Sequence, residues 1–237
     1  MKGMEIQIGI AKVNKYASSE SGDTVEAIER PSGGLSIVMA DGQSSGRGAK
    51  SISSMVVRKV ISLLAEGIRD GAAARAASDY LFTERRGKVT STLNIFSTDM
   101  QTGTLVITRN NPHPVILAYG DEIRLLSEEC KPIGIYRDTR PWISEVPLEG
   151  GMTAVMYTDG LVHAGSRYGE NVDIVGTLQC LIEEEDAPPQ VIADALLDQA
   201  TKLDQGRPVD DTSVVVLRVS PRSGDGVRRM TIRLPIG

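Results

Sequence analysis

The sequence is poor in aromatic residues, cysteines and histidines. Aromatic residues make up 4% of the 237-residue chain, so a buried core must rely on aliphatic side chains. The two cysteines, Cys130 and Cys180, have no CxxC spacing, which argues against a disulfide framework and a cysteine zinc site. We interpret both as reduced thiols that pack as small apolar groups. With only two histidines, a Ser-His-Asp hydrolase has little support.

Long apolar runs are also missing. No stretch approaches the roughly 18 apolar residues of a transmembrane helix, and the first residues lack the apolar segment of a secretion signal. The net charge of −5 argues against a nucleic-acid partner, because phosphate backbones attract Lys and Arg. The late basic cluster that ends at Arg233 is interpreted as part of a solvated tail. We therefore expect a cytoplasmic protein with neither a membrane nor a nucleic acid as its partner.

The hydrophobic periodicity of the chain predicts many strands and two pairs of helices. The expected strands cover residues 5–13, 24–30, 35–40, 89–96, 104–108, 115–119, 123–126, 152–157 and 212–219. The expected helices cover residues 49–69, 72–84, 171–184 and 189–203. Short connections favour antiparallel pairing, so we expect an α+β sandwich of two sheets flanked by helices. Residues 1–220 are predicted to form one domain, and residues 221–237 a tail or, over 230–234, an extra strand.

Three acidic positions share one local context at the ends of apolar strands. Asp41-Gly42 follows the strand that ends at Ala40, and Asp159-Gly160 follows the strand that ends at Tyr157. Asp210 and Asp211 directly precede the last strand. A single Asp-Gly pair is usually a turn, but three such positions at strand ends predict a cluster of rigidly held carboxylates. Such oxygens are the ligands that Mg²⁺ and Mn²⁺ prefer, and two cations about 3.5–4 Å apart can share one carboxylate. Asp41, Asp159 and Asp210 are therefore the expected catalytic residues.

The Gly46-x-Gly48 segment allows two interpretations. A glycine-rich loop that opens a helix can cradle a phosphate. The segment lacks the Gly-Lys-Ser/Thr ending of a nucleotide-binding P-loop. We favour turn geometry that sets Asp41 against the following helix.

The ordered set of motifs resembles the metal-dependent serine/threonine phosphatases of the protein phosphatase 2C (PP2C) type. The matching segments are Ser21–Asp23, Met39–Gly46, Asn111–Pro114, Lys131–Gly134, Tyr157–Leu161 and Asp210–Ser213. They run in the family's order over residues 5–219. The similarity is to the bacterial branch of the sporulation stage II phosphatase and the stress-response phosphatases, and most of all to the phosphatase that resets the stressosome.

The resemblance implies a four-layer αββα sandwich with two Mn²⁺ or Mg²⁺ ions at one edge. On that pattern Asp41 bridges both ions, Gly42 offers its carbonyl, and Asp159 and Asp210 hold the second ion. Asp23 matches an early aspartate that contacts the ions directly or through water. Asp211 belongs to the same ligand group but stands where many relatives carry Asn, which favours a supporting role. The implied substrate is a phosphorylated STAS-domain protein of a stressosome or partner-switching signal-transduction pathway.

The chain also departs from the family. Gln43 replaces the histidine that eukaryotic members place two residues after the bridging aspartate, so the proton donor to the leaving group is open. No clear match to the phosphate-binding arginine of eukaryotic members is present. His113 lies between two prolines and is interpreted as a packing residue, whereas His163, four residues after Asp159, is a weaker candidate for the site. Two other functions stay open: a catalytically silent partner-binding module, and a phosphodiesterase or nuclease, which the net charge disfavours.

Overall fold

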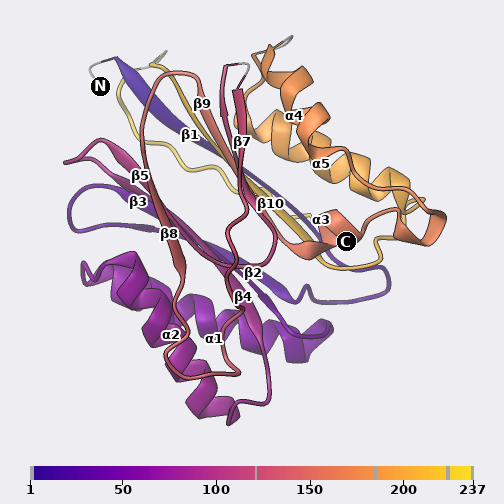
Figure 1. Ribbon diagram of the computed structural model, residues 1–237. Coiled ribbons are helices and arrows are strands. Elements are labelled where there is room, and N and C mark those ends of the chain that lie inside the picture. The colour runs from indigo at the N-terminus through magenta and orange to yellow at the C-terminus, as the bar shows by residue number, and fades with distance from the viewer. Residues whose placement is uncertain (1–2, 121, 184–185, 223–224, 236–237) are drawn as a thin grey trace.

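Two five-stranded antiparallel sheets pack face to face between two layers of helices (Figure 1). The computed structural model describes residues 3–120, 122–183, 186–222 and 225–235. One sheet has the strand order β1-β10-β9-β6-β7 and the other the order β2-β3-β4-β5-β8. The expected αββα sandwich is confirmed.

The strands of the first sheet come from both ends and the middle of the chain. They are β1 (Met4–Val13), β10 (Thr212–Pro221), β9 (Met152–Tyr157), β6 (Val115–Tyr119) and β7 (Glu122–Leu126). The strands of the second sheet are β2 (Asp23–Glu29), β3 (Leu35–Gly42), β4 (Ser91–Asp99), β5 (Thr104–Asn110) and β8 (Trp142–Pro147). Because β10 pairs with both β1 and β9, the first and last strands of the chain lie side by side in this sheet.

Each sheet has its own helical cover. The helices α1 (Gly46–Ala65) and α2 (Asp70–Arg85) cover the second sheet, while α4 (Ile174–Glu183) and α5 (Pro189–Leu203) cover the first. A short helix α3 (Asp159–His163) and the turn η1 (Ser166–Tyr168) lie between β9 and α4. None of the described helices is long and apolar enough to cross a membrane.

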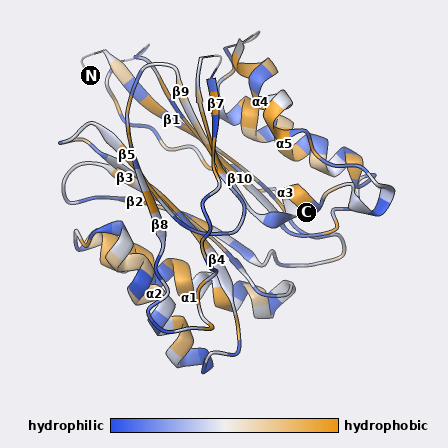
Figure 2. Cartoon of the chain, viewed as in Figure 1, coloured by the Kyte–Doolittle hydropathy of each residue, from blue (hydrophilic) through white to orange (hydrophobic). Residues whose placement is uncertain are grey.

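The core is aliphatic and divided into three clusters, one between the sheets and one under each helical layer. Between the sheets, Met39, Phe96 and Leu117 are almost fully buried. Figure 2 shows the same pattern, with apolar residues along the strands and on the inward faces of the helices. Burial on both faces explains why β3, β9 and β10 read as nearly continuous apolar runs.

Apart from the one-turn η1 and shifted ends, such as α1 ending at Ala65 instead of residue 69 and α4 beginning at Ile174 instead of residue 171, the structure differs from the predicted elements in three places. β8 was not predicted, because this edge strand is half exposed and its alternating residues lie between Pro141 and Pro147. The short helix α3 was also not predicted. Residues 225–235 contain neither helix nor strand, so the candidate strand over 230–234 does not form.

Candidate metal centre

Four aspartates meet at one edge of the sandwich. Asp23 begins β2 and lies opposite Asp41 in the antiparallel ladder with β3. Asp159 is the first residue of α3, and Asp210 lies just before β10. The first pair therefore comes from one sheet and the second pair from the other, and the charges of Asp23, Asp159 and Asp210 all act on Asp41.

Asp41, Asp159 and Asp210 open onto a cavity of about 360 Å³, which we call the metal cavity. Its other lining residues are Lys15, Gly42, Gln43, Ser44, Ser45, Thr90, Ser91, Thr92 and Pro132. Among these lining residues Lys15 has the one cationic side chain. The cavity is therefore negative on the side of its aspartates.

Asp23 links the two sheets beneath the cavity. Its Oδ2 accepts hydrogen bonds from the hydroxyls of Thr158 (2.9 Å), which directly follows β9, and of Ser213 (2.7 Å) in β10. Its Oδ1 is buried and has no hydrogen-bond donor among the described residues. Burial raises the pKa of Asp23 to about 6, although the two hydroxyls act in the opposite direction.

Asp41 is the most perturbed carboxyl of the group. Burial, together with the charges of Asp23, Asp159 and Asp210, raises its pKa to about 9. Its backbone is fixed because the Ser91 hydroxyl donates to the Asp41 carbonyl at 2.7 Å. A carboxylate in this position is costly unless a cation balances its charge.

Asp159 and Asp210 are more accessible than the strand pair, since each side chain is 34% exposed. Burial raises the pKa of Asp210, and the backbone N–H of Asp211 opposes this by donating to its carboxylate at 3.0 Å. The Lys15 ammonium lies 4.0 Å from Asp210 Oδ1.

Asp211 does not line the cavity. Its two carboxylate oxygens accept the backbone N–H groups of Lys15 (2.9 Å) and Gly22 (2.8 Å), so it holds both ends of the loop between β1 and β2. Asp211 is 3% exposed. This geometry agrees with the supporting role that was expected as an alternative to direct ligation.

The glycines after Asp41 and Asp159 make room for neighbouring backbone. A Cβ atom on Gly42 would lie 2.1 Å from the Ala49 carbonyl oxygen of α1, and one on Gly160 would lie 2.2 Å from the Asp211 carbonyl oxygen. The close packing of β3 against α1 therefore requires Gly42, independently of any metal ion that its carbonyl binds. Gly46 has a positive φ of 69°, which favours glycine, but it is the first residue of α1, so the helix begins three residues earlier than predicted and includes Gly48.

The two histidines meet beside Asp159. The rings of His113 and His163 are edge to face with 6.3 Å between centroids, and His163 Nε2 lies 3.8 Å from Asp159 Oδ2. Burial lowers the pKa of His113. Gln43 lines the cavity, but its amide oxygen accepts the Thr90 backbone N–H at 2.9 Å. The contact between His113 and His163 was not predicted from the sequence.

The arrangement fits hard divalent cations. Among the described residues, no three acidic, His or Cys side chains form a ready cage for one ion. Mg²⁺ and its relatives keep several waters and need only one or two carboxylates each. The buried, unpaired Asp23 Oδ1 and the repulsion around Asp41 are what such cations would relieve.

Sequence reasoning missed two other residues of this site, Lys15 and Ser91. Lys15 reaches the cavity only because Asp211 ties its loop to the start of β10. Ser91 begins β4, which pairs with β3 beside Asp41. No local pattern marks either residue, since both positions depend on contacts between distant segments.

Comparisons with known proteins identify the family of the chain. The family described as stage II sporulation protein E (SpoIIE) matches residues 31–220. Stage II sporulation protein E of Priestia megaterium is 24% identical over 223 residues, which are 92% of this chain and 37% of that protein. The chain thus spans little more than a third of that relative's length.

Solved structures share the fold. The PP2C phosphatase domain with a regulatory fragment of SpoIIE from Bacillus subtilis superposes with a TM-score of 0.79 at 23% identity, over 93% of this chain and 65% of that one. RsbX in complex with magnesium gives a TM-score of 0.69 at 17% identity, over 91% of this chain and 96% of that one. The resemblance to the sporulation branch of the PP2C family is therefore confirmed.

Proposed function

Because the chain belongs to the stage II sporulation protein E family, we propose that it is a metal-dependent phosphatase of phosphoserine and phosphothreonine residues in proteins. The observation that carries this proposal is that Asp41, Asp159 and Asp210 line one open cavity of a PP2C fold, with the charge of the buried Asp23 acting on Asp41. The reaction is hydrolysis of a phosphate monoester to a free hydroxyl group and inorganic phosphate.

Two Mg²⁺ or Mn²⁺ ions would suit this donor set, and RsbX, a protein of the same fold, has been solved in complex with magnesium. Asp41 would be the ligand shared by both ions, because the charges of Asp23, Asp159 and Asp210 all act on it. Gly42, Asp159 and Asp210 would complete the ligands at the cavity. The buried Asp23 would contact the ions directly or through a bound water. Bound there, the ions supply an activated water and offset charge on the phosphoryl oxygens.

The side chains of the chain position these groups. Ser91 holds the backbone of Asp41, and Thr158 and Ser213 hold one oxygen of Asp23, which leaves the other oxygen without a hydrogen-bond partner among the described residues. Lys15 is the cation available to the phosphoryl oxygens at the rim, and Asp211 fixes the backbone that carries it.

Gln43 cannot donate a proton as an acid near neutral pH. Its amide oxygen is already bound to Thr90. We therefore propose water in the open cavity as the proton donor to the leaving oxygen.

The proposed substrate is a phosphorylated STAS-domain protein of a stress-signalling pathway. Support comes from the motif resemblance to the stress-response branch and from the shared fold with RsbX. A cytoplasmic location also stays a prediction from composition. A dephosphorylation assay against phospho-STAS proteins encoded near this gene would test the substrate.

The activity itself is tested with p-nitrophenyl phosphate and Mn²⁺. Replacing Asp41 or Asp159 with Ala should lower kcat/KM by more than about 100-fold, because even indirect partners of metal ligands are worth 10–100-fold. Asp198→Ala is the matched control, since Asp198 is an exposed acid on α5 away from the cavity.

Near-normal turnover by either cavity variant would contradict the proposal. A wild-type protein that binds Mn²⁺ but hydrolyses no phosphomonoester would instead favour the silent partner-binding module.

A further inference from the structure

A second cavity of about 380 Å³ lies beside the metal cavity. It is formed by a segment between β7 and β8 that we call the basic loop, residues 129–140. The lining residues are Glu129, Cys130, Lys131, Tyr136, Arg137, Asp138, Thr139 and Arg140. Three cations and two anions line it, whereas one cation and three carboxylates line the metal cavity. The two neighbouring cavities therefore have opposite charge balance.

The basic loop is also a wall of the metal cavity. Lys131 lines the second cavity, and the next residue, Pro132, lines the metal cavity. Ile133 then forms two backbone hydrogen bonds with Ser91, of 3.0 and 2.9 Å, and Ser91 lines the metal cavity. The two cavities are thus lined by consecutive residues, so the second cavity is within reach of residues that flank a phosphorylated residue in the metal cavity.

The loop is held in place from inside the fold. The buried Asn110 amide donates to the carbonyls of Lys131 (2.9 Å) and Arg140 (3.3 Å), which fixes both ends. The Asp138 backbone N–H donates to Asp79 Oδ1 of α2 at 3.0 Å. A binding surface that is fixed in advance loses little conformational entropy when a partner binds.

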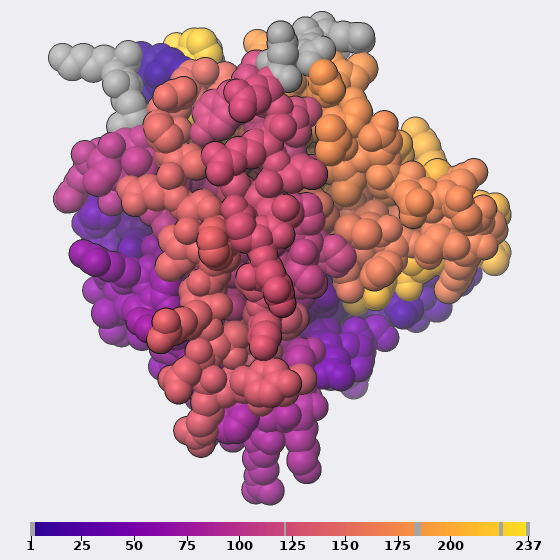
Figure 3. Space-filling model, viewed as in Figure 1, coloured from indigo at the N-terminus to yellow at the C-terminus, as the bar shows by residue number. Residues whose placement is uncertain are grey.

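The cationic side chains are presented to solvent over aromatic rings. The Lys131 ammonium lies 5.6 Å from the ring centroid of Tyr136, and the Arg137 guanidinium lies 4.9 Å from that of Phe82. Tyr136 is 60% exposed, and the loop lies at the surface of the face shown in Figure 3. Such cations can pair with carboxylates of a partner, and Arg can do so with two parallel hydrogen bonds.

We propose that the basic loop binds acidic side chains that flank the phosphorylated residue of the protein substrate. The inference rests on the proposed phosphatase function and names the kind of segment that this site accepts. It assigns Lys131, Arg137 and Arg140 to substrate selection and leaves the hydrolytic step to the metal cavity.

The test compares matched phosphoserine peptides that differ only in their flanking residues. One has Asp at the flanking positions and the other Ala. The wild-type protein should show roughly fivefold higher kcat/KM for the acidic peptide, as expected for two or three exposed ion pairs. Lys131→Glu and Arg140→Glu together should abolish or invert this preference while turnover of p-nitrophenyl phosphate stays unchanged. High salt should reduce the preference of the wild-type protein.

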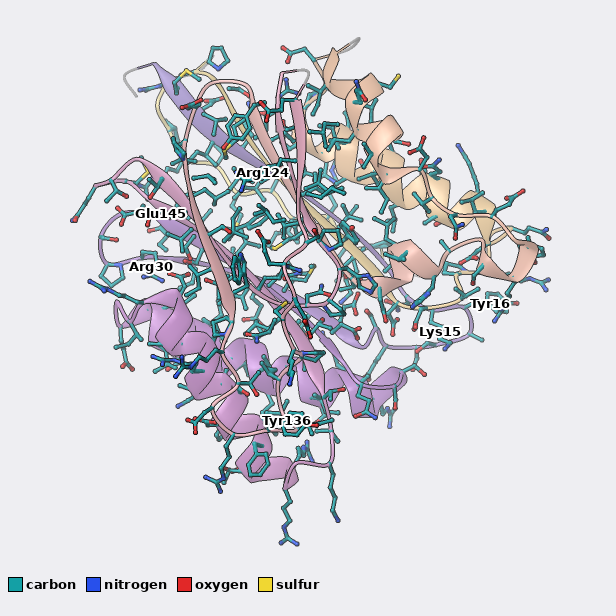
Figure 4. All side chains as sticks on the ribbon, viewed as in Figure 1. Lys15, Tyr16, Arg30, Arg124, Tyr136 and Glu145 are labelled. Carbon is teal, nitrogen blue, oxygen red and sulfur yellow. The ribbon has the colours of Figure 1, made fainter. Side chains whose placement is uncertain are left out.

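Arg124→Glu is the matched control. Arg124 is an exposed arginine of β7, well separated from Tyr136 in Figure 4, and its reversal changes the net charge without touching the loop. It should keep the preference for the acidic peptide. Lys131→Gln and Arg140→Gln, which only neutralise the charge, should give an intermediate preference.

Trp142 offers an independent readout. It is the single tryptophan of the chain, is 42% exposed and follows Arg140 by two residues. Its fluorescence should change with the acidic peptide and not with p-nitrophenyl phosphate.

Three results would overturn the inference. Equal kcat/KM for the two peptides in the wild type would do so, as would an acidic preference that survives Lys131→Glu with Arg140→Glu. A dimer in sedimentation experiments that Arg140→Glu dissociates would assign the loop to a second copy of the chain. If the wild-type protein does not hydrolyse p-nitrophenyl phosphate at all, that result would count against the proposed function instead.

Discussion

The two pairs of aspartates at the metal cavity are held in different ways. Asp23 and Asp41 lie opposite each other inside a strand ladder, and Asp23 has no exposed surface. Asp159 and Asp210 lie outside the strands, with side chains that are each 34% exposed. Burial raises the pKa of Asp41 to about 9 and that of Asp23 to about 6. The strand pair thus carries most of the electrostatic cost of the site, and the other pair is open to solvent.

The difference indicates how such a site can be built at the edge of a sandwich. The strand ladder fixes the position of the shared ligand, because its backbone is hydrogen bonded on both sides to β2 and β4. Residues beyond the strand ends then add ligands from the other sheet. The fold stabilises an arrangement of charges that would not persist in a flexible loop.

The largest expected effect on stability comes from the packing that holds the strand pair. Gly42→Ala would place Cβ 2.1 Å from the Ala49 carbonyl oxygen, so β3 or α1 must move. We expect a loss of about 1–3 kcal/mol in the free energy of unfolding, the usual cost of overpacking. Chemical denaturation of the metal-free protein measures it.

Gly48→Ala is the matched control for Gly42→Ala. No atom lies within 4 Å of the added Cβ, and Gly48 lies in α1. Because Ala is the better helix former, stability should stay the same or rise by up to about 1 kcal/mol. Equal destabilisation by both substitutions would contradict the packing role of Gly42.

The pH dependence of stability should distinguish the two aspartate pairs, with a smaller effect than that of Gly42→Ala. A carboxyl with a folded-state pKa of about 9 binds a proton that the unfolded state releases above about pH 4. The metal-free fold therefore loses stability as pH rises between these two values. Asp41→Asn should remove this loss and raise the Tm of the metal-free protein at pH 8 by at least about 2 °C.

Asp159→Asn provides the comparison, since its accessible carboxylate should leave the stability of the metal-free protein within about 0.5 kcal/mol. Both substitutions should abolish Mn²⁺-dependent turnover. Thermal unfolding in the presence of a chelator measures the stability of both metal-free variants. If Asp159→Asn stabilises the protein as much as Asp41→Asn does, the assignment of the electrostatic cost to the strand pair is wrong.

The sequence predicted the layers and the acidic cluster because both follow from local patterns. Apolar runs marked β3, β9 and β10, and the aspartates at their ends converge because adjacent strand ends meet at one edge of the sandwich. β8 and the basic loop were not predicted, since a half-exposed edge strand has no core pattern and the loop is shaped by Asn110 from β5. Asp211 shows the same limit: sequence alone could not separate a ligand from an anchor for backbone N–H groups.

Calorimetric titration of the metal-free protein with Mn²⁺ tests whether the aspartates form a two-ion site. Two ions should bind per chain with release of protons, because a cation must displace the proton of Asp41. Affinity should rise as pH increases toward 9, and Asp41→Asn should release fewer protons than the wild type, measured by comparing buffers of different ionisation enthalpy. Absence of Mn²⁺ binding at millimolar concentration, or unchanged proton release in Asp41→Asn, would contradict it.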